Sequence, residues 1–158
     1  MDITVRYANK NELNKINELR KMVNEVHASG RPDIFRSDIC SEFCESLYKK
    51  YSADNSDVIA ALIDGKICGF AVVEYIEKPL SSYSLERRFY EVAEFGVDPN
   101  FRRLGVATAL INFCRSEASK KQFDRMELDV WELNEGAIKF YESVGFKTYR
   151  RYMESDVY

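Results

Sequence analysis

This chain of 158 residues is predicted to be an α/β protein with one domain, built on a single mixed, twisted sheet. In its first half, short apolar segments are separated by turn residues, which predicts antiparallel strands. In its second half, strand-like and helix-like segments alternate, which predicts a parallel crossover. The predicted order is strand, two helices, three strands, and then helix, strand, helix, strand. We therefore expect about six to seven strands flanked by about four helices, all within one domain over residues 1–158.

The N-terminal third predicts one strand followed by two helices. Residues 3–7 form the expected strand, and Asn9 with Glu12 three positions later has the spacing of a capping box. Apolar residues then recur at helical spacing, so a first helix should run to about Ala28 before Gly30-Arg31-Pro32 interrupts it. Ser37 is the expected N-cap of a second helix.

The middle and C-terminal segments predict a hairpin and then an alternating pattern. Asp64-Gly65 is a strong two-residue turn signal between two apolar runs. A polar segment rich in serine follows the hairpin and is expected to be a loop. The remaining predicted segments are strands 58–63, 67–76, 89–97, 126–131 and 146–153, helices 105–120 and 134–144, and the loop 77–88.

Composition and charge exclude several classes of protein. Hydrophobic residues make up 46% of the chain and charged residues 31%, which is typical of a globular protein. No apolar run reaches the roughly 18–20 residues of a membrane helix, and the first residues lack the pattern of a secretion signal. The formal net charge of -3 does not suit a general nucleic-acid binder. We expect a cytoplasmic protein that binds neither membrane nor nucleic acid.

Common catalytic and metal-binding motifs are missing from the sequence. The four cysteines, Cys40, Cys44, Cys68 and Cys114, are expected to be free thiols that are buried or half-buried, with no metal site. The single histidine, His27, excludes His-rich metal motifs. There is no G-x-S-x-G elbow, no G-x-G-x-x-G and no P-loop.

One pattern does predict an anion site. A strand ending near Val97 leads through a short turn to Arg102-x-x-Gly105-x-Ala107, which opens a helix. The first turn of a helix presents unpaired N–H groups and the positive end of the helix dipole. Gly105 would let a phosphate approach the backbone, and Arg102 and Arg103 would add positive charge. Alone, this pattern fits a basic turn equally well.

A second segment makes the interpretation specific. "VDPNFRRLGVATAL" and, about thirty residues later, "NEGAIKFYESVGF" resemble the two signature motifs of the GNAT superfamily of N-acetyltransferases, in the same order and separation. The resemblance covers roughly residues 91–150, and the first half resembles the family only in its order of strands and helices. It implies the GNAT fold and acetyl-CoA as cosubstrate, bound where the fourth and fifth strands splay apart. The residues that it assigns to the cofactor are Phe95, Val97, Arg102, Arg103, Gly105, Val106, Ala107, Thr108, Asn134 and Tyr141.

The chemistry of acetyl transfer needs a base and a proton donor. An alkyl amine has a pKa of about 10.4 and must lose a proton before it attacks a thioester. Glu91 and Glu94, on the strand where the family often carries its base, are the candidates, with Glu94 slightly preferred. They point to opposite faces of a regular strand, and a bulge would change that. Tyr141 is the candidate donor to the departing thiolate, whereas Phe140, about 100° around the helix, is expected to face the core.

Two functions are compatible with these residues. The first is an N-acetyltransferase in which a primary amine attacks acetyl-CoA directly within a ternary complex. Its acceptor would be a small-molecule amine or a protein N-terminus, and the protein would be a monomer or homodimer. The second is a non-catalytic module with the GNAT fold that binds acyl-CoA or has a regulatory role. The presence of Tyr141 and two candidate bases favours the enzyme.

Overall fold

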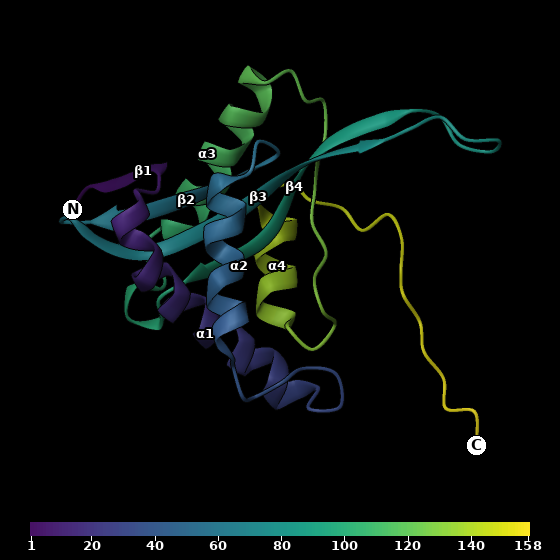
Figure 1. The fold of residues 1–158 in the computed structure, drawn as a ribbon, viewed down its shortest axis with the longest axis horizontal. Coiled ribbons are helices and arrows are strands. Elements are labelled where there is room, and N and C mark those ends of the chain that lie inside the picture. Colours follow the sequence, from purple (N-terminus) through teal and green to yellow (C-terminus); the bar gives the residue numbers. More distant parts are fainter.

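The structure is a computed structural model that describes residues 1–158, and it has the predicted α/β architecture (Figure 1). Its strands are β1 (Ile3–Tyr7), β2 (Ser56–Ile63), β3 (Lys66–Lys78), β4 (Arg87–Val97) and β5 (Met126–Glu127). Its α-helices are α1 (Leu13–Gly30), α2 (Ser41–Ser52), α3 (Val106–Lys120) and α4 (Glu135–Ser143). Two short 3-10 helices, η1 (Lys10–Glu12) and η2 (Pro99–Phe101), precede α1 and α3.

The five strands form one mixed sheet in the order β1-β2-β3-β4-β5. Neighbouring strands from β1 to β4 are antiparallel, and β5 is parallel to β4. The crossover from β4 through α3 to β5 is therefore the one parallel connection, as the alternating pattern in the second half of the sequence predicted.

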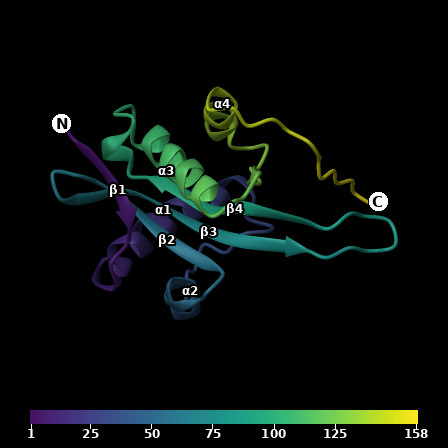
Figure 2. The same cartoon turned by 90° about the horizontal axis from the view of Figure 1, so that it is seen from above.

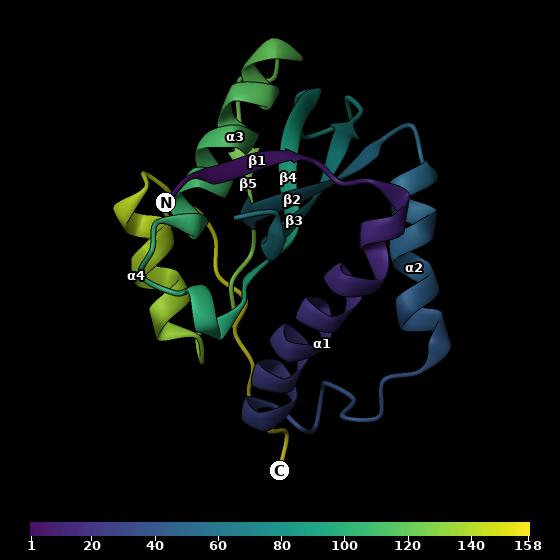
Figure 3. The ribbon, with the colours of Figure 1, turned by 90° about the vertical axis from the view of Figure 1, so that its left-hand side faces the viewer.

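Helices cover both faces of the sheet, with α1 and α2 on one face and α3 and α4 on the other (Figure 3). Each face has its own buried cluster because successive residues of a strand point to opposite sides. Phe70 and Val72 of β3 pack toward α1 and α2, whereas Ala71 and Val73 pack toward α3. The two clusters hold β3 and β4 rigidly in the middle of the molecule.

The predicted capping box is present at the first helix. The Asn9 N–H donates to Glu12 Oε1 at 2.7 Å, and the Glu12 N–H donates to Asn9 O at 2.9 Å. The prediction for the start of the second helix was wrong. Helix α2 begins at Ser41 after Cys40, and Ser37 lies in the preceding bend.

Two strand predictions differ from the structure, which has five strands rather than six to seven. The predicted strand 126–131 pairs with β4 only at Met126 and Glu127, and no strand forms over 146–153. Alternating sequence makes a strand only where a neighbour supplies backbone hydrogen bonds. Beyond Glu127 the chain diverges from β4, and nothing pairs with the outer edge of β5.

Two segments project from the body. The hairpin formed by the distal parts of β3 and β4 extends as an arm, and the C-terminal residues extend from the body in a different direction (Figures 1 and 2). None of the helices combines the length and the hydrophobicity that a membrane crossing requires. All four cysteines are free, with Cys68 and Cys114 buried and the other two half-buried, as predicted.

Candidate active site

The turn between β4 and α3 has an unusual backbone conformation. Arg103 has φ = 62° and Gly105, the N-cap of α3, has φ = 90°. A residue other than glycine is strained in this left-handed region. A Cβ at Gly105 would meet only Ile3 Cδ1 at 3.8 Å, so backbone conformation rather than crowding requires the glycine.

The same turn presents donors and positive charge to solvent. Residues 102–105 are exposed, and the first intrahelical bond of α3 runs from the Ala109 N–H to Gly105 O at 3.0 Å. The preceding N–H groups, of Val106, Ala107 and Thr108, therefore have no partner within the helix. Asp98 stabilises the turn by accepting from the Asn100 N–H at 2.9 Å. The result is a surface with the properties of an anion-binding helix N-terminus.

A wedge opens beside this turn, between β4 and the segment that follows β5. The two strands are paired only where Tyr90 and Glu91 face Met126 and Glu127. From Val92 to Val97 the edge of β4 that points away from β3 has no strand partner. Phe95 and Val97, both predicted to contact the cofactor, lie on this free stretch, where backbone groups are available to pair with an extended ligand.

A bulge places both candidate bases on one face of β4. Glu91 is opposite Glu74 of β3, whereas Glu94 is opposite Val72, so Ala93 is an extra residue in the ladder. Glu74 and Val72 are two apart on β3 and share a face. The bulge therefore turns Glu91 and Glu94 to the same side, the side covered by α1 and α2.

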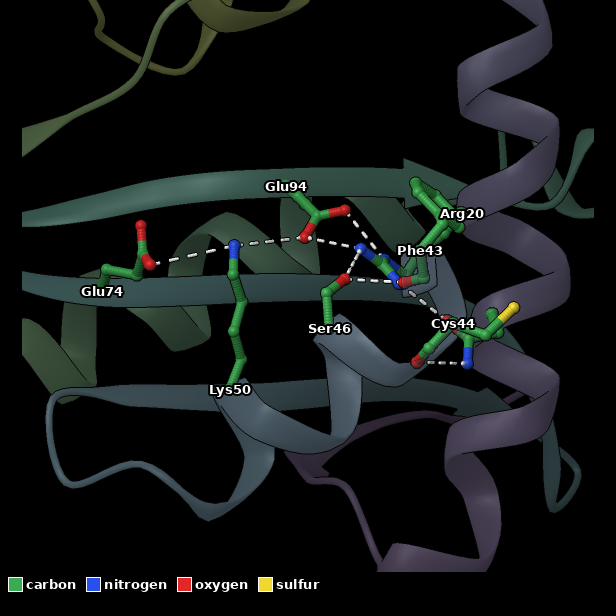
Figure 4. Close-up of polar contacts among 8 residues, drawn as sticks. Arg20, Phe43, Cys44, Ser46, Lys50, Glu74 and Glu94 are labelled. Carbon is green, nitrogen blue, oxygen red and sulfur yellow. Dashed lines mark hydrogen bonds and ion pairs between the residues drawn. The ribbon is translucent and has the colours of Figure 1, made fainter. Parts of the chain in front are cut away.

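The carboxylate of Glu94 is held by two cations (Figure 4). Arg20 of α1 donates from Nε to Oε1 at 2.8 Å and from Nη2 to Oε2 at 3.2 Å. Lys50 of α2 lies with Nζ 3.5 Å from Oε2 and 3.8 Å from Glu74 Oε1. Both oxygens of Glu94 are therefore engaged by cations, which leaves this carboxylate poorly placed to contact a substrate amine.

Arg20 is buried, and all three nitrogens of its guanidinium group donate hydrogen bonds within this network (Figure 4). Its Nη1 donates to Asn17 Oδ1 at 2.7 Å and to Phe43 O at 2.8 Å, and Nη2 donates to Ser46 Oγ at 3.1 Å. One side chain of α1 thus joins both α2 and β4 through hydrogen bonds. The structure buries both Arg20 and the neighbouring Leu19.

Glu91 has different surroundings, because no hydrogen bond or ion pair engages its half-buried side chain. Burial raises the pKa of its carboxyl above the usual value, and the nearby negative charges of Glu74, Asp129 and Glu127 raise it further. A carboxyl with a raised pKa is a better proton acceptor near neutral pH.

Tyr141 and Asn134 lie at opposite ends of α4. Asn134 is the N-cap, and its Oδ1 accepts from the Ala137 N–H at 3.2 Å, which leaves its Nδ2 group free. The Tyr141 ring packs edge-on against Phe95 of β4, with 5.9 Å between ring centroids. Burial raises the pKa of the Tyr141 hydroxyl to about 12, with a further contribution from Asp129. The hydroxyl is therefore a protonated donor throughout the neutral range.

Phe140 packs on the sheet, although its side chain is not fully buried. Its half-buried ring stacks on Phe95 with 6.1 Å between centroids, and no residue of α4 is fully buried. Phe140 and Tyr141 therefore share Phe95 as a neighbour, and α4 rests on the sheet through this aromatic group.

Sequence reasoning did not identify Asp129. Its charge acts on Glu91 and Tyr141, and it partly offsets the lowering of the His27 pKa that burial causes. A sequence signal was available, because Asp129 and Glu127 are two residues apart within the predicted strand 126–131, a spacing that places two side chains on one face of a strand.

An aromatic group connects the α1–α2 region with the segment that follows β5. His27 stacks on Phe35 with 5.0 Å between centroids, and Phe35 packs edge-on against Trp131 with 4.9 Å. A Cβ on Gly30 would lie 2.8 Å from Leu133 Cδ2, so the end of α1 packs closely on the loop before α4.

Comparisons with known proteins agree with this geometry. The model of the acetyltransferase (GNAT) family matches residues 17–146. An uncharacterized N-acetyltransferase of Methanocaldococcus jannaschii, MJ1207, is 35% identical over 99 residues, which cover 60% of this chain and 40% of that protein. The L-amino acid N-acetyltransferase AaaT of Escherichia coli is 28% identical over 134 residues, which cover 79% of this chain and 75% of AaaT.

Solved structures share the fold over almost the whole chain. A tetramutant of the Bacillus halodurans protein BH1408 superposes with a TM-score of 0.91 at 25% identity, covering 98% of this chain and 99% of that one. The aminoglycoside N-acetyltransferase AAC(6')-Iy, in complex with CoA, superposes with a TM-score of 0.73 at 24% identity, covering 98% and 94%. Because the family model spans most of the chain and includes both signature motifs, this protein belongs to the GNAT family of acetyltransferases.

Proposed function

We propose that this protein transfers the acetyl group of acetyl-CoA to the nitrogen of a small-molecule primary amine, by direct attack within a ternary complex. The observation that carries the proposal is the unpaired edge of β4, which leads from the free carboxyl of Glu91 to the glycine-capped start of α3.

Cofactor binding follows from the backbone of the site. The pyrophosphate would lie on the N–H groups of Val106, Ala107 and Thr108, with Arg102 and Arg103 beside it. The pantetheine arm would pair with β4 between Phe95 and Val97, and the Nδ2 of Asn134 would donate to it from the opposite wall.

The chemical step uses one proton acceptor and one donor. The amine nitrogen attacks the thioester carbonyl carbon and passes a proton to Glu91, directly or through water, while a β4 N–H stabilises the carbonyl oxygen. The carbon–sulfur bond breaks, and Tyr141 donates a hydrogen bond to the departing sulfur, which ends as the thiol. Glu91 rather than Glu94 is the proposed base, because Arg20 and Lys50 already pair with Glu94.

The acceptor is proposed to carry positive charge in solution. Three carboxylates, of Glu74, Glu127 and Asp129, lie close enough to Glu91 to raise its pKa, and such surroundings attract an ammonium group. The relatives point the same way, since AaaT is named for amino acids and a soil metagenome enzyme with a TM-score of 0.71 was solved with sisomicin.

A thiol-release assay with acetyl-CoA and a panel of amines tests the activity. Release that depends on an added amine is expected, and the absence of release with every acceptor would favour the alternative of a silent acyl-CoA-binding module. Gly105→Asp tests the cofactor site in the same protein, because its carboxylate would occupy the position of the pyrophosphate. Calorimetry should show lost affinity for acetyl-CoA, with Gly136→Asp, at a glycine with open space around it, as the matched control. Equal affinity in the two variants would exclude the proposed site.

A further inference from the structure

Helix α4, which carries the proposed proton donor Tyr141, has few contacts with the rest of the protein. None of its residues is fully buried, and its aromatic rings pack on a single residue of β4, Phe95. One hydrogen bond joins the helix and its caps to another helix or strand. In that bond, Arg115 Nη2 of α3 donates to Val144 O, at the C-cap of α4, over 2.8 Å. The position of α4 therefore depends heavily on this one arginine.

The C-terminal end of α4 is built around Tyr141. Gly145 has φ = 101°, and its N–H donates to Glu142 O at 3.1 Å. The Phe146 N–H donates to Tyr141 O at 3.0 Å. These two bonds form a Schellman motif, which commonly includes a hydrophobic contact across the turn. Here that contact is between the rings of Phe146 and Tyr141, with 5.8 Å between centroids. Both the backbone and the ring of Tyr141 are therefore fixed to this turn.

Arg115 attaches the same turn to α3. The carbonyl of Val144 lies at the negative end of the α4 dipole, where a cationic donor is favoured. A Cβ on Gly145 would lie 3.9 Å from Arg115 Nη2, so the guanidinium rests close to the glycine of the turn. Helices α3 and α4 lie on the same face of the sheet (Figure 3), and the first turn of α3 is the proposed pyrophosphate site. The arginine thus joins the helix of the proposed donor to the helix that would hold the cofactor.

We propose that Arg115 is a positioning residue, which fixes the hydroxyl of Tyr141 relative to the thioester sulfur of acetyl-CoA. This inference rests on the proposed function, in which Tyr141 donates to the departing sulfur. A proton donor serves only an atom within hydrogen-bond reach, so the distance between the two helices matters to the reaction. Arg115 acts through the carbonyl of Val144 and the turn that holds Tyr141, rather than by contact with the reacting atoms.

The role of Arg115 is alignment rather than stability. Its side chain is exposed, and a charged donor at an exposed helix end contributes little to the free energy of unfolding. The reaction is more sensitive than the fold, because misplacement of a reacting group by about 1 Å can lower a rate about 10²-fold. Loss of Arg115 should therefore slow acetyl transfer while leaving the protein folded.

Single-turnover kinetics test the proposal, with acetyl-CoA and the amine of the panel that releases thiol fastest. Arg115→Met should lower the rate of acetyl transfer about tenfold, as a displacement of less than 1 Å would, and should leave the affinity for acetyl-CoA unchanged. Arg115→Lys should recover most of the rate, because an ammonium group can still donate to the Val144 carbonyl. Lys120→Met is the matched control. It removes the same charge from α3 at a residue that pairs with Glu117 of its own helix, so it should leave the rate unchanged.

Combination with Tyr141→Phe shows whether Arg115 acts through the tyrosine. In the Tyr141→Phe background, Arg115→Met should have no further effect on the rate, because the hydroxyl that Arg115 aligns is absent. The same tenfold loss in both backgrounds, or equal rates in Arg115→Met and Lys120→Met, would overturn this inference alone. A wild-type rate in Tyr141→Phe would overturn the donor role of Tyr141 and this inference with it. Absence of amine-dependent thiol release in the unaltered chain would instead reject the proposed function itself.

Discussion

Glu91 and Glu94 are three residues apart on β4 and face the same side, yet they have different partners. Arg20 and Lys50 pair with Glu94, whereas no ion pair engages Glu91, and three nearby carboxylates raise its pKa more than the charge of Lys50 lowers it. The difference arises because Arg20 of α1 and Lys50 of α2 both reach the carboxylate of Glu94. We propose on this basis that Glu91 is the base, in contrast to the slight preference for Glu94 that position on the strand suggested.

Replacing each glutamate by glutamine should separate these roles in the pH profile. Below the raised pKa of Glu91 the carboxyl is protonated and cannot accept a proton, so kcat/KM should fall on the acidic side, at a pH above the ordinary value for Glu. In Glu91→Gln this acidic limb should disappear and the rate near neutral pH should fall by about 10²–10⁴. Glu94→Gln should keep the limb, and loss of the limb in Glu94→Gln alone would reverse the assignment.

Tyr141→Phe should keep the fold and lower the rate of acetyl transfer. The ring still packs on Phe95, and only the hydroxyl that would meet the sulfur is lost. We expect the affinity for acetyl-CoA to be nearly unchanged. The single-turnover rate should fall by about 10²–10⁴ if proton donation by Tyr141 contributes fully to that rate. Phe140→Ala is the control, because it removes the other ring that contacts Phe95 and should lower stability rather than chemistry. A wild-type single-turnover rate in Tyr141→Phe would make the tyrosine a packing residue.

At the scale of elements, Arg20 joins α1, α2 and β4 in a single network. Close packing supports the same junction, since a Cβ on Gly96 would lie 2.7 Å from Val23 Cγ2 of α1 and from Phe70 Cε1. The helices that form one wall of the wedge are therefore held against the strand that carries the proposed base. Movement of α1 would alter both the carboxylate of Glu94 and the aromatic group around His27.

Arg20→Met should destabilise the fold, because it leaves Glu94, Asn17 and the Phe43 carbonyl without their shared donor. We expect a loss of about 2–4 kcal/mol in the free energy of unfolding, measured by urea denaturation, since Glu94 keeps Lys50 and some contact with solvent. The double variant Arg20→Met with Glu94→Gln should lose less than the sum of the single losses. Strict additivity would mean that the two side chains do not stabilise each other.

At the scale of the whole molecule, helices cover both faces of the sheet, whereas the outer edge of β5 pairs with no other strand. The helices bury both cores, whereas β5 and residues 147–158 keep backbone groups and apolar side chains unpaired.

Local sequence determined much of this protein, including the capping box at Asn9, the Asp64-Gly65 turn and the glycine-opened start of α3. These features depend on a few neighbouring residues, whose conformational preferences hold in any context. The α/β class and the GNAT family also followed from the order of segments and the two signature motifs.

Only the tertiary structure decided what depends on contacts between distant residues. The bulge at Ala93 turns Glu91 and Glu94 to one face, and the burial of Arg20 leaves one of them free; neither effect is visible in the strand itself. The same holds for residues 146–153, which were predicted to form a strand but pair with no strand in the structure. A strand exists only when another strand supplies its hydrogen bonds, and sequence periodicity does not say where that partner lies.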